Sequence, residues 1–321
     1  MKILLVGAGD IPIPPPRWGG VENLMWQQKC ALEAAGHQVA IMNKKKRFRR
    51  NVFRLRAWQY DVIHLHVDTL TRFWVPMARL LRVPLVVSSH YGYAAFPQHW
   101  TDDYRRTFKD MCRAPYLLLL SRETVEAFAA QGCKTDMRFL PNGIHTREMR
   151  FCPESEPRAI CLGRIELRKQ QALLARALRG HTVQCDLVGP VLDLTDFDPD
   201  PSTTHYLGEW SRERVRQDLT RYACLVLISD GEGHAGVISE AMAAGLSLVV
   251  SPEASHNLDL SKPWIYVVDR ERDSLGDVIE KAIRENVQYR ADIRRYCEEN
   301  FDWNVILPRY VQMLQQIADR K

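Results

Sequence analysis

Two glutamates eight positions apart are the strongest chemical signal in the sequence. They bound the segment Glu232-Gly-His-Ala-Gly-Val-Ile-Ser-Glu240, whose spacing predicts a loop followed by a helix over 237–244. The backbone N–H groups between them, at the positive end of that helix, suit an anion. A carboxylate accepts two hydroxyls at once, so Glu240 suits a ribose diol and Glu232 a sugar. The alternative interpretation is a surface glutamate and a second one that stabilises the helix dipole.

A basic pair forms the second signal. Arg164 and Lys169 lie five positions apart in Gly163-Arg-Ile-Glu-Leu-Arg-Lys169, after a predicted strand and at the start of a helix. Ligands of parallel sheets bind at the carboxyl ends of the strands, so the two side chains are expected to converge on a diphosphate. A solvated basic loop is the alternative.

Two further candidates lie in the first half of the chain. Gly19 and Gly20 open the first predicted helix and let the backbone approach a phosphate closely, unless they only form a turn that needs positive φ. His90 ends a predicted strand, where it is expected to face a cleft between domains and donate to a hydroxyl, although a lone histidine is more often structural. His64 and His66 are expected to point to opposite faces of a strand, which would make them a poor metal pair.

Alternating strands and helices must position these residues. This order implies parallel βαβ units and predicts two doubly wound α/β domains in tandem. The predicted domains span 1–152 and 158–301, with the proline-flanked segment 153–157 as a linker and a last helix from about 302. Strands are predicted over 2–6, 37–42, 61–66, 85–89, 116–120, 137–140, 159–162, 184–188, 205–207, 225–228, 248–250 and 264–268. Helices are predicted over 21–35, 70–81, 102–112, 122–131, 170–178, 212–222, 237–244, 275–286 and 305–320.

Composition excludes several classes of protein. The 321 residues are 46% hydrophobic and 26% charged, which is typical of a globular chain of two domains and not of a disordered or coiled-coil protein. No apolar run approaches the ~20 residues of a membrane-spanning helix, and no secretory signal is visible. Eight scattered cysteines without a C-x-x-C pair indicate reduced thiols and therefore predict a cytoplasmic protein.

Charge divides unevenly along the chain. Residues 1–150 hold 23 basic and 12 acidic side chains, net +11, whereas residues 151–321 hold 21 and 27, net −6. The basic half favours an anionic partner. Its stretch Lys44–Trp58 predicts either a basic amphipathic helix that touches an anionic membrane or, as the favoured interpretation, a packed helix with solvated basic side chains. Nucleic acid is not expected as a partner, because no recognised binding module is present.

Taken in order, these motifs are similar to those of one enzyme family. The sequence resembles the retaining GT-B glycosyltransferases of family four, also called glycosyl transferases group 1, over nearly its whole length. The segments that carry the resemblance are Gly19-Gly-Val-Glu22, Ala34-Ala-Gly-His-Gln-Val39, Asp61-Val-Ile-His-Leu-His66, Pro141-Asn-Gly-Ile144, Gly163-Arg164 with Lys169, Glu232 to Glu240, Ala241-Met-Ala-Ala-Gly245 and Phe301-Asp-Trp303.

The resemblance implies two Rossmann-like domains that face a cleft, with the last helix packed back onto the first domain. It implies transfer of a hexose from a nucleoside diphosphate to a hydroxyl of a glycan, lipid-linked or other acceptor. Glu232, His90, Arg164 and Lys169 would then be catalytic. The implied donor contacts are Glu240 for the ribose; Arg164, Lys169 and the backbone of Gly19, Gly20, Gly236 and Val237 for the diphosphate; and Glu232, His90 and the backbone of Gly233, His234 and Ala235 for the sugar.

The implied chemistry needs no metal ion or other cofactor. Departure of the sugar leaves negative charge on the diphosphate, which preorganised Arg, Lys and amide donors stabilise. A displacement on one face of the sugar, in which the leaving phosphate helps to deprotonate the acceptor, retains the anomeric configuration. The chain departs from the family where His234 and Ala235 replace Phe-Gly, which would put a titratable group beside the donor sugar.

Two other functions fit parts of the sequence. A catalytically idle protein that binds a sugar or nucleotide would have the same fold. The segment Val6-Gly-Ala-Gly9 suggests a nicotinamide-dependent oxidoreductase. Against that function, Pro12 replaces the third glycine of the fingerprint, and Asn43 stands where an acidic residue would end the second strand.

Overall fold

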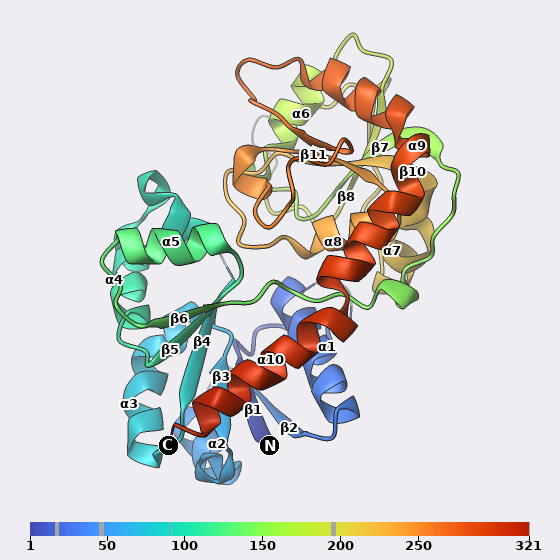
Figure 1. Ribbon diagram of the computed structural model, residues 1–321. Helices are drawn as coiled ribbons and strands as arrows, with labels where there is room; N and C mark the ends of the chain where they lie inside the picture. The colour runs from blue at the N-terminus through green and yellow to red at the C-terminus, as the bar shows by residue number, and fades with distance from the viewer. Residues whose placement is uncertain (17–18, 45–47, 91, 194–196, 321) are drawn as a thin grey trace. The chain divides into compact units, whose positions relative to one another are not determined.

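The computed structural model describes residues 1–16, 19–44, 48–90, 92–193 and 197–320. The chain divides into two units, Met1–Gly143 with Trp303–Lys321, and Ile144–Asp302 (Figure 1). Each unit is built on a six-stranded parallel sheet, so the prediction of two doubly wound α/β domains is confirmed. Residues 45–47 of the predicted basic stretch, together with Trp18 and Asp196, lie outside the described residues.

The sheet of the first unit has the strand order β2-β1-β3-β4-β5-β6. Its strands are β1 (Lys2–Gly7), β2 (Gln38–Asn43), β3 (Val62–Leu65), β4 (Leu85–Ser89), β5 (Tyr116–Leu119) and β6 (Asp136–Phe139). Its helices are α1 (Gly20–Ala34), α2 (Phe48–Arg54), α3 (Thr71–Leu81), α4 (Asp102–Met111), α5 (Arg122–Ala130) and α10 (Trp303–Ala318).

Alternate residues of β1 are buried on opposite faces of that sheet. Ile3 and Leu5 are fully buried in the core that includes α1 and α10, whereas Leu4 and Val6 are buried with α3, α4 and α5. This alternation is what a strand covered on both sides requires. Helix α10, coloured red in Figure 1, packs beside α1, so the last helix belongs to the first unit although it ends the chain.

The sheet of the second unit has the strand order β12-β11-β10-β7-β8-β9. The first strand in sequence, β7, therefore lies in the middle, and the winding reverses direction between β7 and β10. The strands are β7 (Glu156–Leu162), β8 (Gln184–Val188), β9 (Thr204–Tyr206), β10 (Tyr222–Leu227), β11 (Ser247–Val250) and β12 (Ile265–Val267). The helices are α6 (Gln171–Ala177), α7 (Arg212–Asp218), α8 (Gly236–Ala243) and α9 (Leu275–Phe301).

The boundary between the units lies at Gly143–Ile144 and not at 152–158 as predicted from the prolines. The Ile144 N–H donates to the Phe301 carbonyl (2.9 Å), which ties this point of the chain to the end of α9. The proline-flanked segment 153–157 leads directly into β7 and is part of the second unit. Backbone pairing, and not composition, therefore determines where the second unit begins.

Helix α9 is far longer than the predicted helix over 275–286, because it continues to Phe301. Its buried positions repeat at helical spacing but include two polar residues, Asn286 and Arg290. The Asn286 amide donates to the Gly245 carbonyl and to Ser247 Oγ, both at 3.0 Å. Buried polar residues with internal partners break the apolar pattern from which a helix is predicted.

Helix α2 and the turn after it combine a packed side with exposed aromatic rings. Val52 and Ala57 are fully buried, as the packed-helix interpretation expects. Phe53 and Trp58 are 60% and 45% exposed, with ring centroids 6.1 Å apart. No helix in the described part of the chain is long and apolar enough to cross a membrane.

Candidate active site

Two loops at the carboxyl ends of neighbouring strands form the centre of the site. One loop, 163–170, follows β7, and the other, 228–235, follows β10, which pairs with β7 in parallel. These strands flank the point where the winding reverses, which is where open α/β sheets bind ligands. The predictions from the sequence placed Arg164 and Lys169 on the first loop and Glu232 on the second, and the strand order brings these loops together.

Glycines hold the first loop close to β8. Gly189 has φ +147°, and a Cβ there would lie 1.9 Å from the Gly163 carbonyl oxygen. The Gly163 N–H in turn donates to the Val188 carbonyl (2.8 Å). The position of Arg164 therefore depends on a contact that only glycine permits at residue 189.

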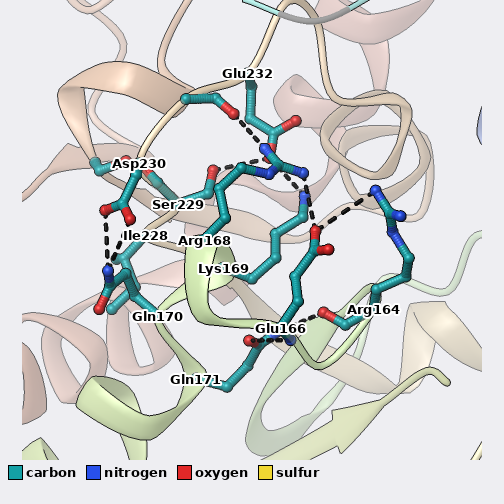
Figure 2. Close-up of polar contacts among 12 residues, drawn as sticks. Arg164, Glu166, Arg168, Lys169, Gln170, Gln171, Ile228, Ser229, Asp230 and Glu232 are labelled. Atoms are coloured by element: carbon teal, nitrogen blue, oxygen red, sulfur yellow. Dashed lines mark hydrogen bonds and ion pairs between the residues drawn. The ribbon is translucent and has the colours of Figure 1, made fainter. Parts of the chain in front are cut away.

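Glu232 pairs with the basic residues of the first loop (Figure 2). Its Oε1 lies 2.5 Å from Lys169 Nζ and 3.2 Å from Arg168 Nη1, and it accepts a hydrogen bond from Ser229 Oγ (2.8 Å). Burial by itself would raise the pKa of Glu232, but Lys169 and Arg168 outweigh it and hold that pKa below its ordinary value. Glu232 is therefore a carboxylate at neutral pH, and Lys169 is only 9% exposed.

A second carboxylate, Glu166, lies between the two arginines of the loop (Figure 2). Its Oε1 is 3.0 Å from Arg168 Nη2 and 3.5 Å from Arg164 Nη2. These contacts join three cations, Arg164, Arg168 and Lys169, to two carboxylates, Glu166 and Glu232. The third carboxylate of the loops, Asp230, pairs with Arg270. Arg168 is not among the residues predicted from the sequence, although it directly precedes Lys169 in the same basic run.

A hydrogen-bonded layer beneath these side chains connects the two loops. The Asp230 N–H donates to the Arg168 carbonyl (2.8 Å), and the Gln170 amide donates to both Asp230 carboxylate oxygens (3.0 and 2.8 Å). Arg270, which follows β12, also pairs with Asp230 and lies 3.2 Å from Glu253. The cations above are thus preorganised, because their loops are fixed to each other without a ligand.

Glu240 takes a different cationic partner from Glu232. Its Oε1 lies 2.6 Å from Nη1 of Arg212, the first residue of α7. Helix α8 begins at Gly236, where a Cβ would meet no atom within 4 Å, so the space before the helix is open to a ligand. The first N–H groups of a helix have no partner within it. The two glutamates therefore have separate cationic partners, and the anion-binding role of the backbone between them stays a prediction.

His234 differs from what the sequence led us to expect. Its side chain is buried, 5% exposed, with Nε2 3.4 Å from Ser239 Oγ and its ring 5.2 Å from that of Phe301. Burial, with the nearby His256, lowers the pKa of His234 to about 4. The imidazole is therefore buried and neutral at pH 7, and its position beside the donor sugar stays a prediction. The backbone role of residues 233–235 stays a prediction.

The glycines of the first unit lie at the start of α1. Gly19, with φ +154°, precedes the helix, and a Cβ there would meet Glu22 Oε2 and Pro15 Cβ at 3.1 Å. The turn that needs positive φ is therefore present at Gly19. A Cβ at Gly20 would meet no atom within 4 Å, which leaves the backbone of that residue open to a phosphate.

The oxidoreductase alternative loses support at the end of β2. Asn43 Oδ1 accepts a hydrogen bond from the Gly9 N–H (2.6 Å), and its amide donates to the Ile11 carbonyl (2.7 Å). A Cβ at Gly7 would lie 2.7 Å from the same Oδ1. Asn43 thus holds the loop after β1 and is not placed to hold a dinucleotide ribose, as an acidic residue would be there.

His90 belongs to a row of histidines at the carboxyl ends of β3 and β4. Its Nε2 lies 3.0 Å from His66 Nδ1, and the rings of His64 and His66 are 3.9 Å apart. The prediction that His64 and His66 point to opposite faces was wrong, because residues two apart on a strand share a face. His64 contacts Tyr310 Oη (2.6 Å) and Ser88 Oγ (2.7 Å). Burial lowers the pKa of His64 to about 3 and that of His90 to about 4, so both rings are neutral at pH 7.

Two matches to known protein families cover most of the chain. Residues 42–148 match the family described as Glycosyltransferase Family 4. Residues 146–300 match the family described as Glycosyl transferases group 1, and this match contains every predicted donor residue from Arg164 to Glu240. The chain belongs to these family 4, group 1 glycosyltransferases. No curated protein sequence matches it.

Solved structures share the GT-B fold of this glycosyltransferase over its whole length. Anabaena HepE in complex with UDP and glucose is 16% identical, with 98% of this chain and 100% of that chain covered and a TM-score of 0.76. Sucrose-phosphate synthase from Thermosynechococcus elongatus is 15% identical, with both chains covered completely and a TM-score of 0.78. AviGT4, a glycosyltransferase involved in avilamycin A biosynthesis, is 17% identical over 100% of this chain and 98% of its own, with a TM-score of 0.70.

Potential metal ligands of the glycosyltransferase gather elsewhere in the second unit. Among the described residues, one group of three is close enough to hold an ion: His181, between α6 and β8, with Asp277 and Glu280 at the start of α9. None of these residues was predicted to bind the donor. The cations of the candidate site, Arg164, Arg168 and Lys169, lie on the loop after β7 and are not part of this group.

Proposed function

We propose that this glycosyltransferase moves a hexose from a nucleoside diphosphate to an acceptor hydroxyl, with retention of configuration and without a metal ion. The observation that carries this proposal is the cluster of Arg164, Arg168 and Lys169 at the carboxyl end of β7, held by Glu166 and Glu232. Structures of HepE in complex with UDP and with UDP-glucose support a nucleotide sugar as the donor class. Glu240 would bind the ribose and Glu232 the sugar.

The proposed reaction breaks the bond between the anomeric carbon and the diphosphate oxygen. The acceptor oxygen forms its new bond on the same face of the sugar, and its proton passes to the departing phosphate. Arg164, Lys169 and the N–H groups of Gly236 and Val237 stabilise the charge that develops on the diphosphate. In Glu232, the contacts within the described residues involve Oε1, which leaves Oε2 to accept a sugar hydroxyl.

A nucleotide panel followed by a turnover assay tests this proposal. At a hundredfold excess over its dissociation constant, a nucleoside diphosphate adds ~2.7 kcal/mol of stability, which raises the melting temperature by several degrees. We expect one of UDP, GDP and ADP to do so, and NAD to have no effect. The matching nucleotide sugar should then be consumed at the same rate with excess EDTA. NMR spectroscopy of the glycosylated product measures its anomeric configuration.

Each contrary result removes a different part of the proposal. Binding without turnover over a panel of acceptors would favour an idle protein, and a shift with NAD alone would favour an oxidoreductase. A loss of activity in EDTA that Mg²⁺ or Mn²⁺ restores would contradict the metal-free reaction. Inversion of the anomeric centre would contradict retention. The contact of Gly20 and His90 with the donor stays a prediction, to be examined with His90→Ala.

For the acceptor side, we propose that α2 and the following turn touch an anionic membrane that carries a lipid-linked acceptor. The exposed rings of Phe53 and Trp58 lie on a segment with the exposed residues Arg54 and Arg56. Apolar rings beside basic side chains suit an anionic interface. We expect co-sedimentation with vesicles that contain phosphatidylglycerol, and its loss in Phe53→Ser/Trp58→Ser. The exposed Leu80→Ser variant is the matched control. Equal binding by all variants would contradict the proposal.

A further inference from the structure

We propose that Arg212 is a positioning residue that fixes Glu240 in the orientation in which it recognises the 2′-hydroxyl of the donor ribose. This role rests on the proposed function, which assigns the ribose to Glu240. Arg212 is not among the residues predicted from the sequence, since it lies 28 positions before Glu240 at the start of a different helix. The geometry of the pair carries the inference.

The first observation is the contact itself. Arg212 Nη1 lies 2.6 Å from Glu240 Oε1, and the two side chains are only 27% and 12% exposed. Glu240 is the ion-pair partner of the guanidinium, and Arg212 Nε is buried without a hydrogen-bond partner among the described residues. The backbone of Arg212 is also fixed, since Ser211 Oγ caps α7 by accepting from the Arg214 N–H (3.1 Å).

The ion pair leaves most of the Glu240 carboxylate available to a ligand. A carboxylate offers about four lone-pair directions, of which Arg212 occupies one on Oε1. The remaining directions can accept both hydroxyls of a ribose. Glutamate is among the side chains that lose most rotamer freedom when they are immobilised, and the ion pair has removed that freedom before the nucleotide binds. Arg212 therefore strengthens recognition of the hydroxyls without touching them.

The same helix provides a matched control. Arg216 lies one turn after Arg212, is 31% exposed, and has Nη2 2.5 Å from Oε2 of Glu148, which is no part of the candidate site. Arg212 and Arg216 thus have the same side chain, similar exposure and a similar ion pair. They differ in the glutamate that each holds.

The test compares nucleotides with and without the 2′-hydroxyl. Dissociation constants for the nucleoside diphosphate that binds in the panel of UDP, GDP and ADP, and for its 2′-deoxy form, are measured by calorimetry for the wild type, R212Q, R216Q, E240Q and R212Q/E240Q. We expect R212Q to weaken binding of the ribonucleotide about tenfold and of its 2′-deoxy form less than about twofold. R216Q should change neither. In the double-mutant cycle, R212Q should add almost nothing to E240Q.

The outcomes separate this inference from the proposed function. An equal loss for both nucleotides in R212Q, or full additivity with E240Q, would make Arg212 a structural residue and overturn the inference. If E240Q loses discrimination against the 2′-deoxy form and R212Q keeps it, only the role of Arg212 fails. If the wild type binds no nucleoside diphosphate, or if E240Q leaves discrimination intact, the assigned role of Glu240 fails and the inference fails with it.

Discussion

Replacing Lys169 with methionine is expected to lower turnover by roughly 10²–10³-fold, the cost of removing one preorganised charge-stabilising donor. Lys169 is nearly buried and pairs directly with Glu232 on the facing loop. An interaction that strengthens as charge develops on the leaving group lowers kcat more than it raises KM. Steady-state kinetics with the nucleotide sugar identified by the binding panel measures both constants.

Two controls distinguish this effect from loss of structure. Lys262 pairs with Asp259 (3.5 Å) outside the candidate site, so Lys262→Met should leave turnover unchanged. Lys169→Met leaves Glu232 less well neutralised, and the melting temperature is expected to fall. The pair Lys169→Met/Glu232→Gln should recover the melting temperature without recovering turnover. Recovery of both would show that Lys169 only neutralises Glu232, and a loss below fivefold in the single variant would contradict the assignment.

Replacing Arg290 with methionine is expected to produce the largest loss of stability, about 3–5 kcal/mol. Arg290 is 1% exposed and has no carboxylate partner among the described residues. Burial lowers its pKa to about 10, so the side chain is still charged at neutral pH. Its nitrogens donate to the carbonyls of Cys152 (3.0 Å), Tyr222 (3.0 Å), Thr220 (2.7 Å) and Ala244 (3.3 Å) and to Asn286 Oδ1 (2.8 Å).

Methionine has a similar volume but no donor, so these buried acceptors would lose their partner. For a unit of this size, a loss of that order lowers the melting temperature by roughly 6–20 °C, which calorimetry can measure. Arg295 lies on the same helix with its side chain 65% exposed, and Arg295→Met should change stability by less than ~0.5 kcal/mol. A shift below about 2 °C in Arg290→Met would refute the role assigned to its hydrogen bonds.

Much of the fold follows from the sequence because local signals were sufficient. Buried strands such as β4 and β8 have the bounds that their apolar runs predict. Helix α9 shows where that approach fails, since Asn286 and Arg290 occupy its buried face and find their partners on distant elements. The predicted boundary between the units was wrong for a similar reason. The boundary depends on the pairing of Ile144 with Phe301, which are far apart in the chain.

The candidate site also has a part that could be predicted from the sequence and a part that could not. Arg164, Lys169, Glu232 and Glu240 could be predicted from the sequence. They are basic residues or glutamates that stand near glycines and next to predicted strand ends and helix starts. In a parallel sheet the carboxyl ends of all strands lie on one edge, so position in the chain alone brings such residues to the same edge. Residue type and local position were therefore enough to name these candidates.

The partners of these residues were decided by tertiary structure. The order of the strands places β10 beside β7, which brings Glu232 to Lys169 and Arg168 across more than sixty residues of sequence. The start of α7 brings Arg212 to Glu240, and burial makes His234 a packing residue. Ion pairing acts over a few ångströms and is insensitive to separation along the chain. For that reason the sequence by itself determined Arg164, Lys169, Glu232 and Glu240 as candidates, whereas only the folded chain added Arg168 and Arg212 and decided which charge meets which.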